Sequence, residues 1–173
     1  FTGHPLLEAL AQEKSEISRD PLLFALLPGS RVREVKRIFP VMVEAARQIH
    51  AVRPDVRFEA VAASEAQAER LHSLVKGAPV EVRWESAHDL MQRAGAGLVC
   101  SGTATLEAAF FGLPHALVYK VAWLTYEVGV RLVKVDALGI INILNTNRSD
   151  PSSERPPHII REFIQHAATP EAL

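Results

Sequence analysis

Two short segments of the sequence combine glycine, hydroxyl and charged side chains in a pattern that suits anions. The first is PGSR, residues 28–31, and the second is SGTATLE, residues 101–107. Each follows an apolar run of strand length and precedes a stretch with helical spacing, so each is expected at a turn from a strand into a helix. Ligands of open parallel sheets bind beyond the carboxyl ends of the strands, where such turns lie. The two segments therefore predict a ligand site.

The first segment carries side chains that suit the oxygens of a phosphate group. Gly29 lets the backbone approach a ligand closely, Ser30 either caps the following helix or donates its hydroxyl, and Arg31 brings a forked cation. Together they predict an anion-binding corner. The alternative is a tight turn in which Arg31 pairs with Glu34 on the surface.

The second segment precedes a helix whose first N–H groups carry a partial positive charge that also suits phosphate. It contributes Ser101, Gly102 and Thr103 to the predicted site. Glu107 falls about one turn into that helix, where its carboxylate could accept two hydrogen bonds from a ribose diol. The alternative is a helix capped by Thr103, with Glu107 solvated. Neither segment is a Walker A loop or a G-x-G-x-x-G fingerprint, which disfavours a P-loop nucleotidase and a plain NAD enzyme.

Composition and charge limit the class of protein. The chain has 173 residues, 48% of them hydrophobic, enough for one sizeable core and too few for two ordinary domains. Its 19 Lys and Arg against 20 Asp and Glu give no global field that would recruit nucleic acid, so no nucleic-acid partner is expected. The single cysteine, Cys100, excludes an internal disulfide and is expected to fill the core. The histidines lack metal-ligand spacing, so no metal site is expected.

Apolar runs of strand length alternate with helical patterns, which predicts an α/β fold with a parallel sheet. Strands are expected at residues 22–27, 58–62, 80–84, 97–100 and 115–120. Helices are expected over residues 35–49, 65–75 and 123–135, and from about residues 86 and 103. The polar, proline-rich residues 145–157 predict a mobile loop. Charges within the apolar stretch 113–135 predict that it does not span a membrane.

Several segments resemble, in order and spacing, the carboxyl-terminal half of the lipid-A-disaccharide synthase family. They are LLPGSRVREV, SGTATLEAAFFGLP, RLVK at 131–134, IIN near 140 and REFIQHAATPEAL. The opening GHPLLE resembles the segment that links the two halves of that family, so residues 1–20 are expected to be an interdomain linker. The resemblance implies one nucleotide-sugar-binding domain over residues 1–173. Its fold would be the Rossmann-like parallel sheet, flanked by helices, of the carboxyl-terminal domain of a GT-B glycosyltransferase.

The resemblance also implies a reaction and its partners. Family members join UDP-2,3-diacylglucosamine to 2,3-diacylglucosamine 1-phosphate and release UDP, in the bacterial cytoplasm at the surface of the inner membrane. The acylated donor, the acylated acceptor and that membrane surface are thus the expected partners, and a second copy of the chain stays open as another. No cofactor is implied. The general base is expected in an amino-terminal acceptor domain that this chain lacks, so the chain alone is expected to be inactive.

The resemblance assigns roles to the two turns and to two further residues. Residues 29–31 and 101–103 would face the phosphates of UDP, and Glu107 would hold the ribose. Asn142 matches a family asparagine that contacts the donor, and Glu34 matches a partner of Arg31. The family pattern is interrupted before Glu162 and Gln165 by the insertion that contains residues 145–157. Two alternatives share the nucleotide turns: the UDP-sugar-binding half of another enzyme, such as a UDP-sugar epimerase, and a binding module without catalysis of its own.

Overall fold

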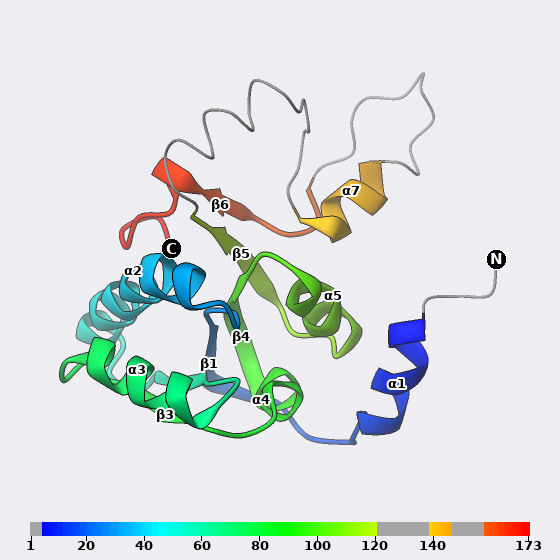
Figure 1. The fold of residues 1–173 in the computed structure, drawn as a ribbon, viewed down its shortest axis with the longest axis horizontal. Helices are drawn as coiled ribbons and strands as arrows, with labels where there is room; N and C mark the ends of the chain where they lie inside the picture. Colours follow the sequence, from blue (N-terminus) through cyan, green and yellow to red (C-terminus); the bar gives the residue numbers. More distant parts are fainter. Residues whose placement is uncertain (1–4, 121–138, 147–157) are drawn as a thin grey trace.

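The computed structural model describes residues 5–120, 139–146 and 158–173 of the chain (Figure 1). Six strands form one sheet in the order β3-β2-β1-β4-β5-β6, and every neighbouring pair is parallel. The strands are β1 (Asp20–Leu27), β2 (Arg57–Val61), β3 (Val80–Arg83), β4 (Ala94–Cys100), β5 (His115–Tyr119) and β6 (Glu162–Ile164). This order is that of doubly wound dinucleotide-binding sheets, so the prediction of a Rossmann-like parallel sheet is confirmed.

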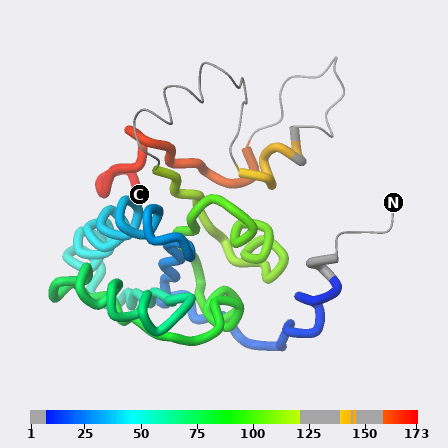
Figure 2. Tube along the Cα trace, in the orientation of Figure 1, coloured from blue at the N-terminus to red at the C-terminus, as the bar shows by residue number. Residues whose placement is uncertain are grey.

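Helices cover both faces of the sheet. Those that the structure describes are α1 (Pro5–Glu13), α2 (Val32–Val52), α3 (Glu65–Val75), α4 (Ala87–Arg93), α5 (Thr103–Phe110) and α7 (Ile140–Thr146), with a short 3-10 turn η1 (Gln165–Ala167). One core cluster joins the sheet to α2 and α3, and a second joins it to α1, α4 and α5. Figure 2 shows the same division, with α2 and α3 on one side of the strands and α1, α4 and α5 on the other.

The central strand β1 explains why its sequence is continuously apolar. Leu26 faces the cluster of α2 and α3, whereas Leu23, Ala25 and Leu27 face the opposite cluster. A strand covered on both faces buries side chains of both parities, so its sequence does not alternate. On α2, the buried side chains recur with helical spacing and include Val35, Ile38, Phe39, Met42 and Ala46.

Some predicted elements differ from the structure or fall outside its described residues. Asn145 and Thr146 belong to α7, although the sequence placed them in the polar loop. The loop residues 147–157 and the predicted helix 123–135 lie outside the described residues. Within the predicted linker, residues 5–13 form α1, and Asp20 already starts β1. Among the described residues, none of the helices has the length and apolarity needed to cross a bilayer.

Candidate functional site

A pocket of about 450 Å³ lies at the carboxyl ends of β1, β2 and β4. β2 and β3 extend the sheet on one side of β1, and β5 and β6 extend it on the opposite side, beyond β4. The strand order therefore changes direction between β1 and β4, and this position is the topological switch point of the sheet. Ligands of open α/β sheets bind at such a switch point. The volume is also within the range of small-molecule sites. Position and size together make this pocket the candidate functional site.

The pocket brings together nearly all of the residues that the sequence singled out. All the predicted nucleotide-binding residues except Asn142 line it, as does Glu34. The complete lining is Leu27, Gly29, Ser30, Arg31, Glu34, Val61, Ala62, Ala63, Glu85, Ala87, Met91, Cys100, Ser101, Gly102, Thr103, Ala104 and Glu107. The two turns, 70 residues apart in sequence, thus face one space.

The turn after β1 is held in a conformation that requires glycine. Gly29 has φ +88°, and a Cβ built on it would lie 3.0 Å from Sγ of Cys100 and 3.3 Å from Oε2 of Glu34. The carbonyl oxygen of Gly29 accepts a 2.6 Å hydrogen bond from Nε2 of Gln67, and the Oε1 of this buried amide accepts another from the N–H of Ala63. Gln67, on α3, therefore ties the turns after β1 and β2 together. No local pattern in the sequence indicates this role.

Arg31 and Glu34 form the ion pair that the sequence offered as an alternative to phosphate binding. Nη1 of Arg31 donates to Oε1 of Glu34 at 2.9 Å, and the side chains are 80% and 18% exposed. The hydrogen bond to Glu34 raises the pKa of Arg31 above its usual range, so the guanidinium stays charged. Because a guanidinium has five N–H donors, this bond leaves Arg31 able to contact an anion in the pocket as well.

The helices that follow the two glycine turns, α2 and α5, start without a side-chain cap. Arg31 is the N-cap residue of α2, so the suggested capping role of Ser30 is wrong, and Ser30 is one of the residues that line the pocket. Gly102, with φ +138°, is the N-cap residue of α5, so the suggested cap by Thr103 is also wrong. No described atom lies within 4 Å of a Cβ built on Gly102. Two uncapped helix N-termini next to one pocket favour a negatively charged ligand.

Glu107 lines the pocket and is not the solvated side chain of the alternative interpretation, since it is only 19% exposed. Its Oε2 lies 3.5 Å from Nε2 of His88, on α4. Nδ1 of the same imidazole lies 2.5 Å from Oε2 of Glu13, on α1. The sequence gives no local sign of this role of His88, because its partners are distant in sequence.

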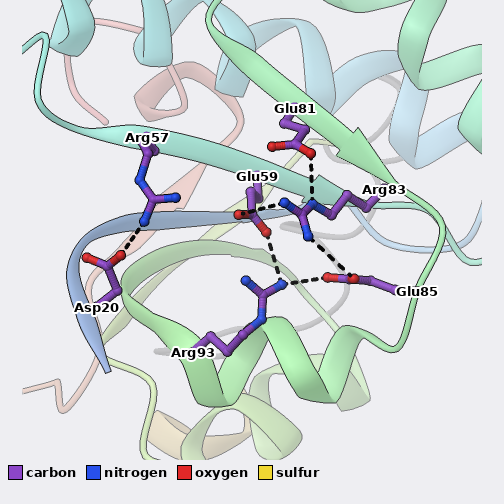
Figure 3. Close-up of polar contacts among 7 residues, drawn as sticks. All are labelled: Asp20, Arg57, Glu59, Glu81, Arg83, Glu85 and Arg93. Atoms are coloured by element: carbon purple, nitrogen blue, oxygen red, sulfur yellow. Dashed lines mark hydrogen bonds and ion pairs between the residues drawn. The ribbon is translucent and has the colours of Figure 1, made fainter. Parts of the chain in front are cut away.

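A third carboxylate at the pocket, Glu85, belongs to a network of charged side chains (Figure 3). Nη2 of Arg93 lies 2.6 Å from Oε1 of Glu85 and 3.0 Å from Oε2 of Glu59. Arg83 lies between Glu59, Glu81 and Glu85. The ion pairs with Arg83 and Arg93 therefore restrain the side chain of Glu85. Alternating charges along residues 81–85 are the only signal of this network in the sequence.

Asn142 lies elsewhere in the structure. Its side chain is buried on α7, where Nδ2 donates to the carbonyl of Ile160 and, at 2.6 Å, to Oε1 of Glu162. Its Oδ1 accepts from the N–H groups of Ile159 and Ile160. Asn142 thus fastens α7 to the segment that leads into β6, and it is not part of the pocket lining. The structure does not bring this predicted donor contact to the other site residues.

Cys100 is the last residue of β4 and one of the residues that line the pocket. Burial, together with the negative charge of Glu34, raises the pKa of the thiol to about 12. A thiol with so high a pKa is a poor nucleophile, in line with the expected core role. Within the described ranges, no three His, Cys, Asp or Glu side chains are grouped so that they could hold a metal ion.

The fold and the pocket define an α/β domain of the Rossmann-like class with a ligand-sized pocket at its switch point. Comparison with known proteins narrows the class, since the family model described as lipid-A-disaccharide synthetase matches residues 1–172. The chain belongs to this family. Among curated relatives, the lipid-A-disaccharide synthases of Geobacter sulfurreducens and Thiobacillus denitrificans are 37% and 36% identical over the whole chain. The chain covers 45% and 46% of these relatives, or about half their length.

Two solved structures are similar at a TM-score of 0.43 each. One is a putative UDP-N-acetylglucosamine 2-epimerase from Listeria monocytogenes, 19% identical, with 80% of this chain and 37% of that chain covered. The other is the pneumococcal O-GlcNAc transferase GtfA in complex with UDP and GlcNAc, 16% identical, with 68% and 24% covered.

Proposed function

We propose that this chain is the donor-binding domain of a glycosyltransferase of lipid A biosynthesis. The enzyme that contains it would join UDP-2,3-diacylglucosamine to 2,3-diacylglucosamine 1-phosphate in a β-1,6 linkage and release UDP. Membership of the lipid-A-disaccharide synthetase family supports this reaction over that of a UDP-sugar epimerase. The observation that carries the proposal is that both glycine turns and Glu107 line one shared pocket at the switch point.

Each part of the pocket has a task in this proposal. The diphosphate of UDP would lie against the N-termini of α2 and α5, with Arg31 beside it, and Glu107 would accept the ribose hydroxyls. The 6-hydroxyl of the acceptor attacks the anomeric carbon of the donor, the bond from that carbon to the diphosphate oxygen breaks, and UDP leaves with the electron pair. Positive charge already in place at the pocket stabilises the negative charge that develops on UDP.

The remaining parts of the reaction are assigned outside the pocket. The attacking hydroxyl must be held in line and must lose its proton, which needs an acceptor site and a base. We place both in the half of the family enzyme that this chain does not span. Both substrates are acylated, so we also propose that the enzyme works in the cytoplasm at the surface of the inner membrane.

The direct test is a titration of the 173-residue chain with UDP, observed by two-dimensional NMR. Chemical-shift changes are expected first at residues 29–31 and 101–107. Arg31→Ala should weaken binding, whereas Arg33→Ala, which removes an exposed guanidinium of α2 outside the pocket, should not. Absence of binding, or shift changes confined to other parts of the sheet, would refute the proposal.

A further inference from the structure

His88 stands between two carboxylates that belong to different helices. Its Nδ1 lies 2.5 Å from Oε2 of Glu13 on α1, and its Nε2 lies 3.5 Å from Oε2 of Glu107 on α5. The imidazole ring also packs against the ring of Phe111, with 5.1 Å between the centroids. These contacts come from different directions, and the side chain is only 22% exposed. The ring is therefore fixed in place.

Glu107 needs such a fixed neighbour if its carboxylate is to accept two ribose hydroxyls at once. A glutamate side chain has several rotatable bonds, and ordering them on binding costs conformational entropy. Within the described part of the chain, His88 is the one basic side chain within 4.0 Å of the Glu107 carboxylate. The imidazole is thus the group that restrains this carboxylate before a ligand arrives, which reduces the cost of ordering it on binding.

We propose that His88 is a positioning residue that orients Glu107 for the ribose of the nucleotide. This inference rests on the proposed function, because it takes the ribose as the ligand of Glu107. His88 itself is not part of the pocket lining, so it acts through Glu107. The consequence is a specific one: loss of His88 weakens recognition of the ribose hydroxyls and spares the contacts to the diphosphate.

A purely structural role for His88, as a link between α1 and α4, is already filled by other contacts. Nε2 of Gln92 donates to the carbonyl of Glu13 at 3.2 Å, and the N–H of Ser15 donates to Oε1 of Gln92 at 2.7 Å. Nη1 of Arg19 donates to the carbonyls of Met91 and Ala94. This junction remains when His88 is replaced, so the effect of a substitution should fall on Glu107.

Two substitutions separate the nitrogen positions of the ring. The side-chain nitrogen of asparagine lies where Nδ1 of histidine would be, and that of glutamine lies near the position of Nε2. His88→Asn therefore keeps a nitrogen next to Glu13 and removes the one next to Glu107, while His88→Gln keeps the nitrogen next to Glu107. Both substitutions remove the ring and its contact with Phe111, so each is the control for the other.

The experiment measures dissociation constants of UDP and 2′-deoxy-UDP by calorimetry on the 173-residue chain and its variants. The parent should prefer UDP by about tenfold or more, because the deoxy analogue lacks a hydrogen bond to a charged group. His88→Asn should reduce this preference to about threefold or less and leave the affinity for 2′-deoxy-UDP within about twofold of the parent. His88→Gln should retain most of the preference.

Failure of this inference and failure of the proposed function give different results. If the parent does not bind UDP, or if Glu107→Ala leaves the preference for UDP unchanged, the role of Glu107 is wrong and the inference falls with it. If Glu107→Ala abolishes the preference but His88→Asn keeps it, or if both His88 variants lose it equally, the inference alone is overturned. Circular dichroism checks the fold of each variant, and His88→Ala replaces His88→Asn should the latter not fold.

Discussion

The guanidinium of Arg93, on α4, lies 3.0 Å from the carboxylate of Glu59, on β2, whose side chain is only 3% exposed (Figure 3). Arg83 approaches the same carboxylate to 3.6 Å from the end of β3. Two arginines thus compensate one buried negative charge. A buried charge whose partners are present is tolerated, but removal of one side of such a network leaves charges without compensation.

Glu59→Gln should therefore destabilise the domain. Removal of one partner of a fully buried pair costs about 3–5 kcal/mol, and because both arginines are partly exposed we expect about 2–3 kcal/mol here. Asp20→Asn is the matched control, since it removes the charge from the more exposed Asp20–Arg57 pair of the same sheet and should cost less than about 1 kcal/mol. Urea denaturation gives both values. Equal losses in the two variants would contradict the role of Glu59.

Binding of UDP should not require a divalent cation. Arg31 and the uncapped N-termini of α2 and α5 supply positive charge at the pocket, and the described residues hold no cluster of three His, Cys, Asp or Glu side chains that could bind a metal ion. We expect the same dissociation constant in buffer with excess EDTA and in buffer with magnesium. A UDP signal that EDTA abolishes would show that charge compensation at the pocket has been assigned to the wrong groups.

Glu107→Ala should weaken UDP binding by about 1.5–3 kcal/mol, the range for hydrogen bonds to charged groups. Ribose hydroxyls that lose their acceptor stay desolvated in the pocket, which is the physical reason for the loss. Glu69→Ala is a suitable control, because it removes an exposed carboxylate of α3 outside the pocket and should leave affinity unchanged. Calorimetry on both variants, with the fold checked by circular dichroism, decides the matter.

The parts of the fold that were predictable from sequence are those that local pattern determines. The helix over residues 65–75 has the predicted bounds, and β1 begins two residues before its predicted start, because apolar spacing and turn residues mark such elements directly. The two turns at residues 28–31 and 101–103 were recognisable for the same reason. Their meeting at one pocket followed from the general rule that parallel strands place their carboxyl ends on one edge of the sheet.

The residues that no local sequence pattern indicates are those whose role comes from long-range contacts. Gln67 acts on Gly29 across 38 positions, and His88 contacts Glu13 across 75. A glutamine or histidine on a short polar helix gives no local sign of such a partner. For Asn142, a match to a family position indicated a ligand contact. Within this chain its buried amide hydrogen bonds with Ile160 and Glu162, and the ligand contact stays a prediction.

Cys100 should be unreactive in the folded protein and should make the fold sensitive to alkali. With a pKa of about 12, the native thiol is almost entirely protonated at pH 8, whereas an exposed thiol has a pKa near 8.5. A thiol-specific reagent at pH 8 should therefore modify the chain slowly when folded and rapidly in guanidinium chloride. Since Cys100 is the single cysteine of the sequence, the readout is unambiguous.

The same shift determines the direction of the pH effect. The pKa of Cys100 is higher in the folded state than in the unfolded state. Its contribution to the stability of the fold is therefore fully present at pH values below the pKa of the unfolded state. This contribution is lost as the pH rises from about 9 towards 12. The free energy of unfolding of the parent should thus fall more steeply between pH 7.5 and pH 10.5 than that of Cys100→Ala. The variant shares the parent's lysines and tyrosines, so their titration largely cancels in the comparison. If the two pH profiles are parallel, or if the native thiol is modified rapidly at pH 8, Cys100 ionises as an exposed thiol does. Either result would contradict the burial of this side chain at the end of β4.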